Sequence, residues 1–454
     1  MEFESAPAHL TAMEDGPRLG APDTAAPAVP RHPLAPFKRP SFTLLFVGQL
    51  VSVLGDQVYG VALPWTVLAV TGDARQMAVV LTAGTVPRVL LLLVSGALAD
   101  RLNPRVVMLA ADVGRAAVVG ALGITLFVGL PPLWVVAALA ALEGAGSGLF
   151  GPGVQALLPR LVPAGELAAA NGLMMVVQYA TLAVGPVLGG VATAAQATFA
   201  FLADAASFVV SALALAGIRL PRRAPQAGAA QPAVAARQHL LAEIGAGLRY
   251  TFQTPLVRAT MVVTILANLG FSGAFGVALI VLSRNLSPNP VTLGLLLAAV
   301  GVGGIVGGLC AGLLARRRRR GLTIIALWVL ASLLMVALPF VAGPASHLAL
   351  APDLGLGAQV RIGVIAGMLG LIGVVLALGD TLVLTIMQQR IAPEYMARVF
   401  SVQFLAGGIG QPLSLVGAGL LVAAYGPGIV FVIGGALVLL AIMLGATSRE
   451  IRHL

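Results

Sequence analysis

Charge is scarce in this sequence. Only 10% of its 454 residues are Asp, Glu, Lys or Arg, whereas 59% are hydrophobic and the mean hydropathy is +0.98. Soluble globular domains carry about 25% charged residues. The composition therefore excludes a soluble domain and predicts a polytopic membrane protein.

Residues that hold metals or perform catalysis are also rare. The single cysteine, Cys310, excludes an internal disulfide and a thiolate metal cluster, and we interpret it as a small apolar side chain within a helix. No phosphate-binding Gly-x-x-x-x-Gly-Lys string occurs. We expect no metal site, no cofactor and no enzyme activity. The five histidines all fall in predicted tails or loops, at His9, His32, His239, His347 and His453.

Long apolar runs are what the sequence has in abundance. The 55 glycines and the low aromatic content of 5% favour helices that approach each other closely. A helix of roughly 20 apolar residues crosses a bilayer core, so we expect an all-α protein with twelve transmembrane helices. The twelve runs are 42–70, 77–98, 106–128, 132–157, 168–192, 197–217, 258–283, 291–314, 322–343, 361–388, 397–424 and 427–447.

Polar segments divide these runs into two sets of six. Residues 1–40 are rich in Ala and Pro and predict a disordered cytoplasmic tail. Apolar residues recur at helical spacing in the polar linker 219–257, which favours an amphipathic helix on the membrane surface over a plain connector. The linker separates a first six-helix bundle, 41–218, from a second, 258–448, which a short tail, 449–454, follows.

The two halves share short strings in the same order. The pattern Gly-x-Leu-Ala followed by charge occurs at 96–101 and again 216 positions later, and the same offset relates 60–63 to 276–279. A third string, 160–163, matches 390–393 at an offset of 230. These matches predict an internal duplication and hence two pseudo-symmetric bundles.

The basic residues indicate the orientation of the helices. With the amino terminus inside, 22 of the 27 Lys and Arg residues fall on the cytoplasmic side, and Arg75, Arg284 and Arg361 fall outside. We therefore expect a multi-pass protein of the cell membrane with both termini cytoplasmic. The net charge of +10 reflects this topology and gives no reason to expect a nucleic-acid partner.

A charged turn lies between the second and third apolar runs, at residues 96–105. It resembles the cytoplasmic loop motif of the major facilitator superfamily. That motif usually has a second basic residue directly after the position of Arg105, and Val106 stands there in this chain. Within the superfamily, the chain is similar to the bacterial drug and siderophore exporters of the macrolide-efflux and enterobactin-exporter type. The resemblance implies the major facilitator fold and a gating role for five residues: Gly96, Asp100, Arg101, Arg105 and Arg398.

A string in the fifth helix resembles the antiporter motif of the same family. Its proline removes a backbone hydrogen bond and its glycines admit a neighbouring helix, so it also fits a simple small-residue interface. Thr181 replaces one glycine of the pattern, and Ala140 stands where many proton antiporters have an arginine. By resemblance the motif implies export rather than uptake. Its residues are Gly172, Gly185, Pro186, Gly189 and Gly190.

Several charged residues fall inside predicted helices, where each is costly. Asp112 and Arg115 are three residues apart, so they can pair, or they can line a binding site. Asp56 has no evident local partner and no counterpart in the second half, and we expect it to carry protons. A salt bridge from Asp56 to Arg88 or Arg115, or contact with substrate, is the alternative. Glu143 is the second proton-coupling candidate, with a packing role as its alternative.

Two further acids and a set of aromatic residues complete the candidates. Asp204 and Asp380 lie nearer the ends of their helices, where we expect their side chains to reach toward water. Five aromatic residues are candidates to line an apolar substrate cavity, although ordinary packing between helices also explains them: Phe46, Tyr59, Phe271, Phe275 and Phe404.

The predicted function is export of a small amphipathic organic compound by proton antiport and alternating access between the two bundles. The expected partners are that substrate, protons and the lipid bilayer, and the expected state is a monomer. Uptake of a metabolite or lysolipid is the alternative on the same fold. A membrane enzyme or sensor that transports no solute is the alternative from a different class.

Overall fold

The computed structural model describes residues 32–101, 103–129, 131–219, 255–314, 320–390 and 393–447. For 93–101, 164, 255–257, 259, 312–314, 320, 385, 388–390, 393–405 and 446–447 it describes the backbone alone. This part of the chain is helical and contains no strand. The helices are α1 (Pro40–Thr71), α2 (Ala74–Arg101), α3 (Pro104–Thr125), α4 (Leu133–Leu161), α5 (Leu167–Ala195), α6 (Ala197–Gly217), α8 (Pro255–Gly273), α9 (Leu279–Leu286), α10 (Pro290–Leu314), α11 (Arg320–Ala342), α12 (Ala358–Arg390), α13 (Pro393–Tyr425) and α14 (Pro427–Thr447).

Twelve of these segments are long and apolar enough to cross a membrane, as the sequence predicts. A π-helical segment, η3 (Ala274–Ala278), joins α8 and α9 into one span. Short 3₁₀ turns lie at η1 (Ala35–Lys38), η2 (Ala164–Glu166) and η4 (Gly343–Ser346). Residues 35–38 were expected in the disordered tail, but Phe37 of η1 stacks on Phe42 and Phe46 of α1. The rest of that tail and the predicted amphipathic helix of the linker lie outside the described residues.

The predicted turn near residue 100 is tight. Pro104 begins α3, and the side chain of Asn103 accepts a hydrogen bond of 3.1 Å from the backbone N–H of Arg105. An Asn cap followed by a proline at the first helical position is a strong start signal for a helix. The charged turn therefore ends one span and begins the next within a few residues.

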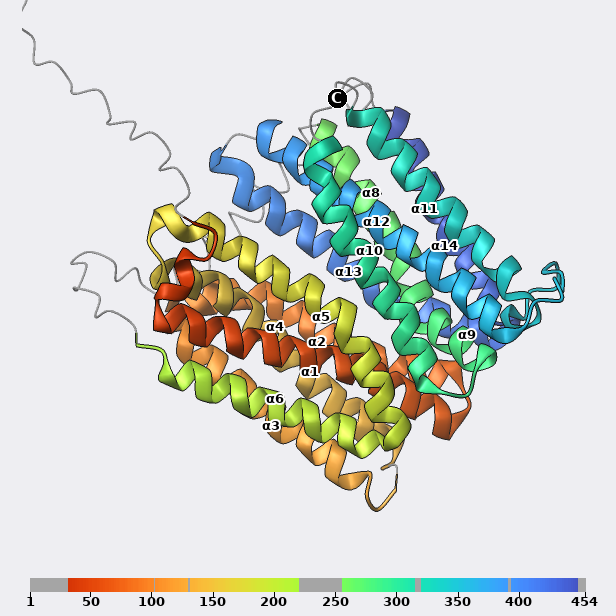
Figure 1. Ribbon diagram of the computed structural model, residues 1–454, viewed down its shortest axis with the longest axis horizontal. Coiled ribbons are helices and arrows are strands. Elements are labelled where there is room, and N and C mark those ends of the chain that lie inside the picture. The colour runs from red at the N-terminus through yellow and green to blue at the C-terminus, as the bar shows by residue number, and fades with distance from the viewer. Residues whose placement is uncertain are drawn as a thin grey trace, which may run out of the picture.

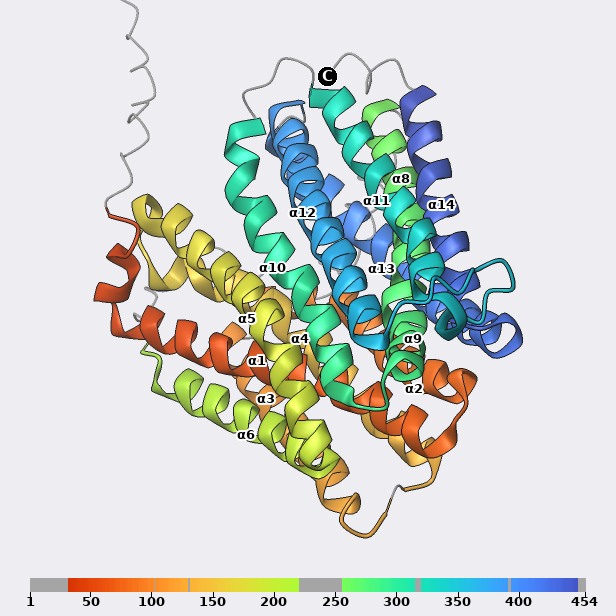
Figure 2. The same ribbon diagram turned by 45° about the vertical axis from the view of Figure 1, so that its right-hand side comes forward.

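The spans form two bundles, α1–α6 and α8–α14, that meet at one end and diverge at the other (Figures 1 and 2). We call the end where α1 begins and α14 ends the terminal face, and the opposite end, where α1 ends and α10 begins, the distal face. The bundles come together along two seams, α5 against α10 and α2 against α13. Both views show the halves separating toward the terminal face.

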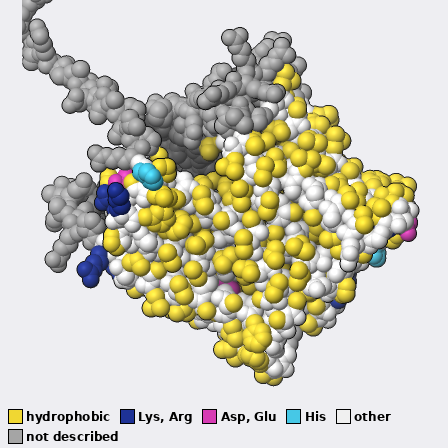
Figure 3. Space-filling model, in the orientation of Figure 1, with side chains coloured by type: hydrophobic (Ala, Val, Ile, Leu, Met, Phe, Trp, Pro, Cys, Tyr) yellow, Lys and Arg dark blue, Asp and Glu magenta, His cyan; other side chains and the backbone are white. Residues whose placement is uncertain are grey.

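Described charged side chains lie mainly at the ends of the helices, and the flank between them is largely apolar (Figure 3). The three arginines predicted to lie outside all sit at the distal face, where each has a partner. Arg75 pairs with Asp73 at 3.0 Å, and Arg361 pairs with Asp353. The side-chain hydrogen bond from Arg75 holds the pKa of Asp73 below its usual range. The alternation of faces predicted from the basic residues is thus present in the fold.

Glycine permits the closest helix contacts, and one of them gives a test of the fold. Gly144 of α4 faces α2, and a Cβ atom there would overlap the carbonyl oxygen of Gly84. Overpacking of this kind costs about 1–3 kcal/mol or more. Gly144→Ala should therefore lower the thermal unfolding temperature of the purified protein. Gly151→Ala on the same helix meets no atom within 4 Å and should leave that temperature unchanged or raise it slightly. Equal effects of the two variants would contradict the packing described here.

Candidate functional site

A buried arginine lies at the centre of the amino-terminal bundle. The side chain of Arg115, on α3, is 3% exposed and binds acids from two other helices. Its Nη2 donates to Asp56 of α1, and its Nη2 and Nε donate to Oε1 of Glu143 of α4 at 3.0 and 3.2 Å. Its guanidinium also lies 3.9 Å from the ring centroid of Phe208 on α6, in cation–π contact. One cation therefore joins four helices of the bundle.

The expectation that Asp56 has no partner is wrong, because Arg115 binds it. The alternative of a salt bridge to Arg115 is the arrangement present, whereas Arg88 is exposed on α2 and makes no described ion pair with Asp56. The Asp56 side chain is 37% exposed, compared with 14% for Glu143. Asp56 is therefore the member of the cluster that solvent reaches most readily.

Two more carboxyl groups adjoin this arginine and are fully buried. Asp112 pairs with Arg115 one helical turn away, at 3.9 Å, and the buried Ser211 of α6 lies beside its carboxyl group. Asp204 of α6 accepts a hydrogen bond of 3.3 Å from Ser207, and its other oxygen has no described partner. Both side chains are 0% exposed. The expectation that Asp204 reaches toward water is wrong, because its part of α6 faces α1 and not a membrane surface.

Two glycines make room for this cluster, which we define as Asp56, Asp112, Arg115, Glu143 and Asp204. A Cβ atom on Gly146 of α4 would lie 2.6 Å from Cγ of the arginine. A Cβ atom on Gly55 of α1 would overlap a carboxylate oxygen of the α6 acid. The small residues beside the acids in α1 and α4 therefore admit long charged side chains from neighbouring helices.

The predicted gating residues lie at the terminal face. Gly96, Asp100 and Arg101 belong to the last turns of α2 and Arg398 to the first turns of α13, where the backbone alone is described. Arg105 donates from Nε to the Leu215 carbonyl oxygen at 2.7 Å and from Nη2 to that of Ala216. A cation is favourable at the carboxyl end of a helix, so Arg105 stabilises the end of α6.

The predicted antiporter string packs against two different helices. A Cβ atom would lie 2.5 Å from Cβ of Gln57 if placed on Gly185, and 2.9 Å from Cα of Val58 if placed on Gly189. Both glycines thus face α1, next to Asp56. Gly190 faces the other bundle, where a Cβ atom would lie 2.8 Å from the Pro290 carbonyl oxygen.

The remaining members of that string and the residue that replaces its glycine are less crowded. Gly172 has no neighbour within 4 Å that a Cβ atom would meet. Pro186 is buried in α5, and its carbonyl faces Gly294 of α10. Thr181 is buried, and its hydroxyl donates to the carbonyl oxygens of Val177 at 2.7 Å and Gln178 at 3.1 Å, both on its own helix, so it fits the interface without a partner on another helix.

The distal face carries a contact that the sequence did not reveal. Arg284 of α9 donates from Nη1 to the carbonyl oxygen of Leu68, near the carboxyl end of α1. This bond joins the two bundles. In the sequence, the one signal for this contact is that Arg284 is an exception to the positive-inside pattern.

The aromatic candidates fall into separate groups rather than one cavity wall. Phe46 packs in the η1–α1 cluster at the terminal face, and Tyr59 meets Phe201 edge to face at 5.8 Å. Phe271 and Phe275 pack together in the carboxyl-terminal bundle with ring centroids 5.8 Å apart. The Phe404 side chain lies outside the description.

Comparison with known proteins agrees with this architecture. The profile of the family described as "Transmembrane secretion effector" matches residues 31–358. Macrolide efflux protein A of Streptococcus pyogenes is 22% identical over 91% of this chain and 97% of its own length. The multidrug efflux pump Tap of Mycolicibacterium fortuitum is 29% identical over 67% of this chain and 74% of its own length.

Solved structures show the same fold. A bacterial homologue of the iron transporter ferroportin, in its inward-facing state, has a TM-score of 0.67 and 16% identity, and the match covers 90% of this chain and 98% of that one. The nucleoside transporter NupG has a TM-score of 0.67 and 12% identity, with 89% of this chain and 98% of that one covered. These likenesses confirm the predicted major facilitator fold. The chain therefore belongs to the transmembrane secretion effector family of the major facilitator superfamily, whose members are transporters and not enzymes.

Proposed function

We propose that this transporter exports a small amphipathic organic compound in exchange for protons, by alternating access of a central path between its two bundles. The observation that carries the proposal is the imbalance of charge around Arg115. Four carboxyl groups surround one guanidinium, so complete ionisation would leave three uncompensated negative charges. An unpaired buried charge costs several kcal/mol, which protons or an entering cation would remove.

Asp56 is the natural entry point for such a proton. Its side chain is the most exposed of the cluster, and its bond to Arg115 is strongest when the carboxylate is ionised. A proton on Asp56 would weaken that bond and leave the arginine with Glu143. Because α1 also carries Gln57 and Val58 against α5, a change at Asp56 would act on the helix that packs against a seam helix. Proton binding at this position would thereby bias the arrangement of the bundles.

The direction of transport rests on two supports. The similar proteins from S. pyogenes and M. fortuitum are named as efflux proteins. The bundles diverge toward the terminal face, which the basic residues assign to the cytoplasm. This arrangement would receive a cytoplasmic substrate.

The function can be tested with purified protein in liposomes. An imposed pH gradient should drive a fluorescent amphipathic compound uphill against the direction of proton flow, and a protonophore should stop that movement. Dissipation of the pH gradient should depend on the compound. Uphill movement that survives the protonophore would overturn proton coupling, and absence of movement for a wide panel of amphipathic compounds would overturn the substrate class.

The contact between Arg284 and Leu68 should stabilise the arrangement seen here. A hydrogen bond to a charged group contributes about 1.5–3 kcal/mol, and 1.4 kcal/mol is tenfold in an equilibrium. Arg284→Ala should therefore shift the population away from this form by about tenfold or more. Spin labels on Val70 and Pro288, both exposed at the distal face, would report the change as a longer distance in a Cys310→Ser background.

The matched control for this prediction is Arg75→Ala. Arg75 also lies at the distal face, but its described partner is Asp73 of the same bundle. This control should leave the distance distribution unchanged. An unaltered distribution in Arg284→Ala would show that the contact does not hold the distal face closed.

A further inference from the structure

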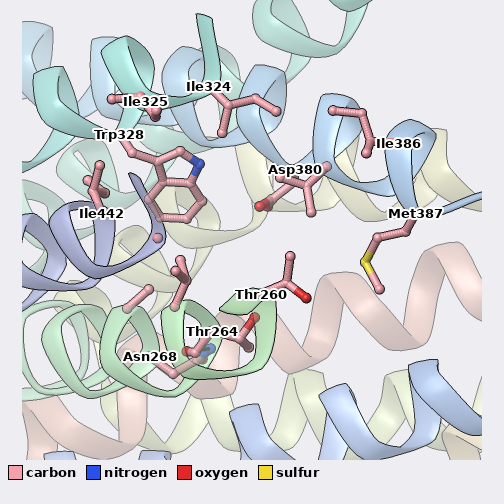
Figure 4. A pocket seen from close by; sticks show the side chains of 14 residues that line it. Thr260, Thr264, Asn268, Ile324, Ile325, Trp328, Asp380, Ile386, Met387 and Ile442 are labelled. Carbon is pink, nitrogen blue, oxygen red and sulfur yellow. Dashed lines mark hydrogen bonds between the residues drawn. The ribbon is translucent and has the colours of Figure 1, made fainter. Parts of the chain in front are cut away.

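The carboxyl-terminal bundle has a cavity of its own, of about 180 Å³, between α8, α11, α12 and α14 (Figure 4). It is separate from the cluster around Arg115, which lies in the other bundle. Most of the side chains that line it are apolar. The polar ones include Thr260, Thr264 and Asn268 of α8 and Asp380 of α12, which face each other across the space.

Asp380 is the only acidic residue within the six spans of this half of the chain. Its side chain is reached by solvent, although protein atoms surround much of it. No ion pair joins it to a described Lys or Arg, and Tyr179 of α5 is a titratable group within electrostatic range. We expected Asp380 to reach toward water at a membrane face. Its carboxyl group instead opens into the cavity. Because a charged carboxylate within a membrane span is costly, a positively charged partner would stabilise it.

The wall opposite this carboxyl group offers hydrogen-bond acceptors. Thr260, Thr264 and Asn268 follow one another at four-residue spacing, so they share one face of α8. The Asn268 amide nitrogen donates to the Thr264 carbonyl oxygen at 2.9 Å, which directs the donor end of the amide to the backbone. Its Oδ1 and the threonine hydroxyl oxygens are acceptor groups on this wall.

An indole closes one side of the cavity. A Cβ atom on Gly379 would lie 2.7 Å from Nε1 of Trp328, so only glycine admits the ring beside Asp380. Phe271 holds the other side of the indole edge to face, with ring centroids 6.1 Å apart. An aromatic ring beside a carboxylate is suited to a cation that also has an apolar part, because the ring can cover the apolar part while the acid neutralises the charge.

We propose that this cavity binds the cationic head of an organic amine, either protonated or quaternary, with Asp380 as its counter-ion and Trp328 against its apolar part. A cavity of about 150 Å³ holds a benzene ring, so this one accepts a group of about that size and not a whole large drug. The role of this cavity as a substrate site rests on the proposed export function. Binding of the cation itself does not depend on that function.

The test uses Trp328 as its own reporter. Trp65→Phe and Trp134→Phe leave Trp328 as the one tryptophan of the full chain. Titration of the purified protein in detergent with benzyltrimethylammonium should change its emission saturably. The neutral isostere neopentylbenzene should bind at least tenfold more weakly.

Variants of the counter-ion make the test specific. Asp380→Asn should weaken binding of the cation at least tenfold at an unchanged unfolding temperature, and Asp380→Glu should retain it. Asp353→Asn, which removes an acid at the distal face, should bind as the parent does. Equal binding of the cation and its isostere, or unchanged binding by Asp380→Asn, would overturn the proposal.

Two sources of such a cation can be distinguished. Competition by phosphatidylethanolamine in nanodiscs, but not by phosphatidylglycerol, would assign the site to a lipid amine, whereas full binding in both would assign it to a solute. Either result keeps the cationic class. Because these measurements need no gradient, failure of binding would leave the proposed export intact, and loss of export with binding retained would count against export alone.

Discussion

Replacing Asp56 with Asn should abolish uphill, proton-driven efflux while leaving downhill exchange of substrate largely intact. Asn has nearly the same shape as Asp but neither carries a negative charge nor binds a proton near neutral pH, so the bond to Arg115 loses its charge-assisted character. The pH-driven and downhill rates of the same liposome preparation would measure the separation of coupling from transport.

The matched control for this variant is Asp73→Asn, which removes an arginine-paired carboxylate at the distal face. Both of its rates should equal those of the parent. If Asp56→Asn pumps uphill at the normal rate, the proton enters elsewhere, and Glu143 becomes the next residue to test because it shares the same arginine.

Arg115→Leu should destabilise the amino-terminal bundle more than any other single change in the cluster. It leaves four carboxyl groups without their cation, and removal of one partner from a buried ion pair costs about 3–5 kcal/mol. The expected result is a large fall in unfolding temperature in detergent, or loss of folded protein from the membrane. Arg115→Lys keeps the charge but not the forked geometry, so its effect should be smaller.

Two comparisons make this result specific to the buried charge. Arg160→Leu removes an exposed arginine at the end of α4 and should have little effect on unfolding. Adding Glu143→Gln to Arg115→Leu should recover part of the lost stability, because one uncompensated carboxylate is gone. A wild-type unfolding temperature in Arg115→Leu would mean that the surrounding acids are already neutral and that the arginine stabilises nothing.

The two bundles share a fold, but they differ in the charged groups that they hold in their interiors. The amino-terminal bundle holds five charged groups in its interior, whereas the carboxyl-terminal bundle holds one acid beside a cavity. In the proposed mechanism, one half would exchange protons and the other would hold the cationic head of the substrate. The two bundles contact each other at the α5–α10 and α2–α13 seams. A movement of one bundle would therefore change its contacts with the other.

The sequence by itself determined the spans, their number and their alternation between two faces. A bilayer accepts only helices long and apolar enough to satisfy every backbone group internally, so hydrophobic runs and breaks decide the spans without reference to neighbours. For this reason the predicted run 197–217 coincides with α6, and the runs near α1 and α2 differ from them by three residues or fewer at each end. The motif at residues 96–105 predicted the tight turn because a charged, proline-broken stretch cannot remain in hydrocarbon.

Only the tertiary structure decided which charges meet. Asp56 and Arg115 are 59 positions apart, and their contact depends on the rotation of α1 and α3 about their own axes, which hydropathy does not encode. The burial of Asp204 followed from Gly55 on another helix, and the setting of Asp380 followed from a cavity shared by four helices. The sequence could show that each charge was costly within the membrane. The partner of each charge depended on packing. Every side chain of a helix faces some neighbour, and the arrangement of the whole bundle determines which neighbour that is.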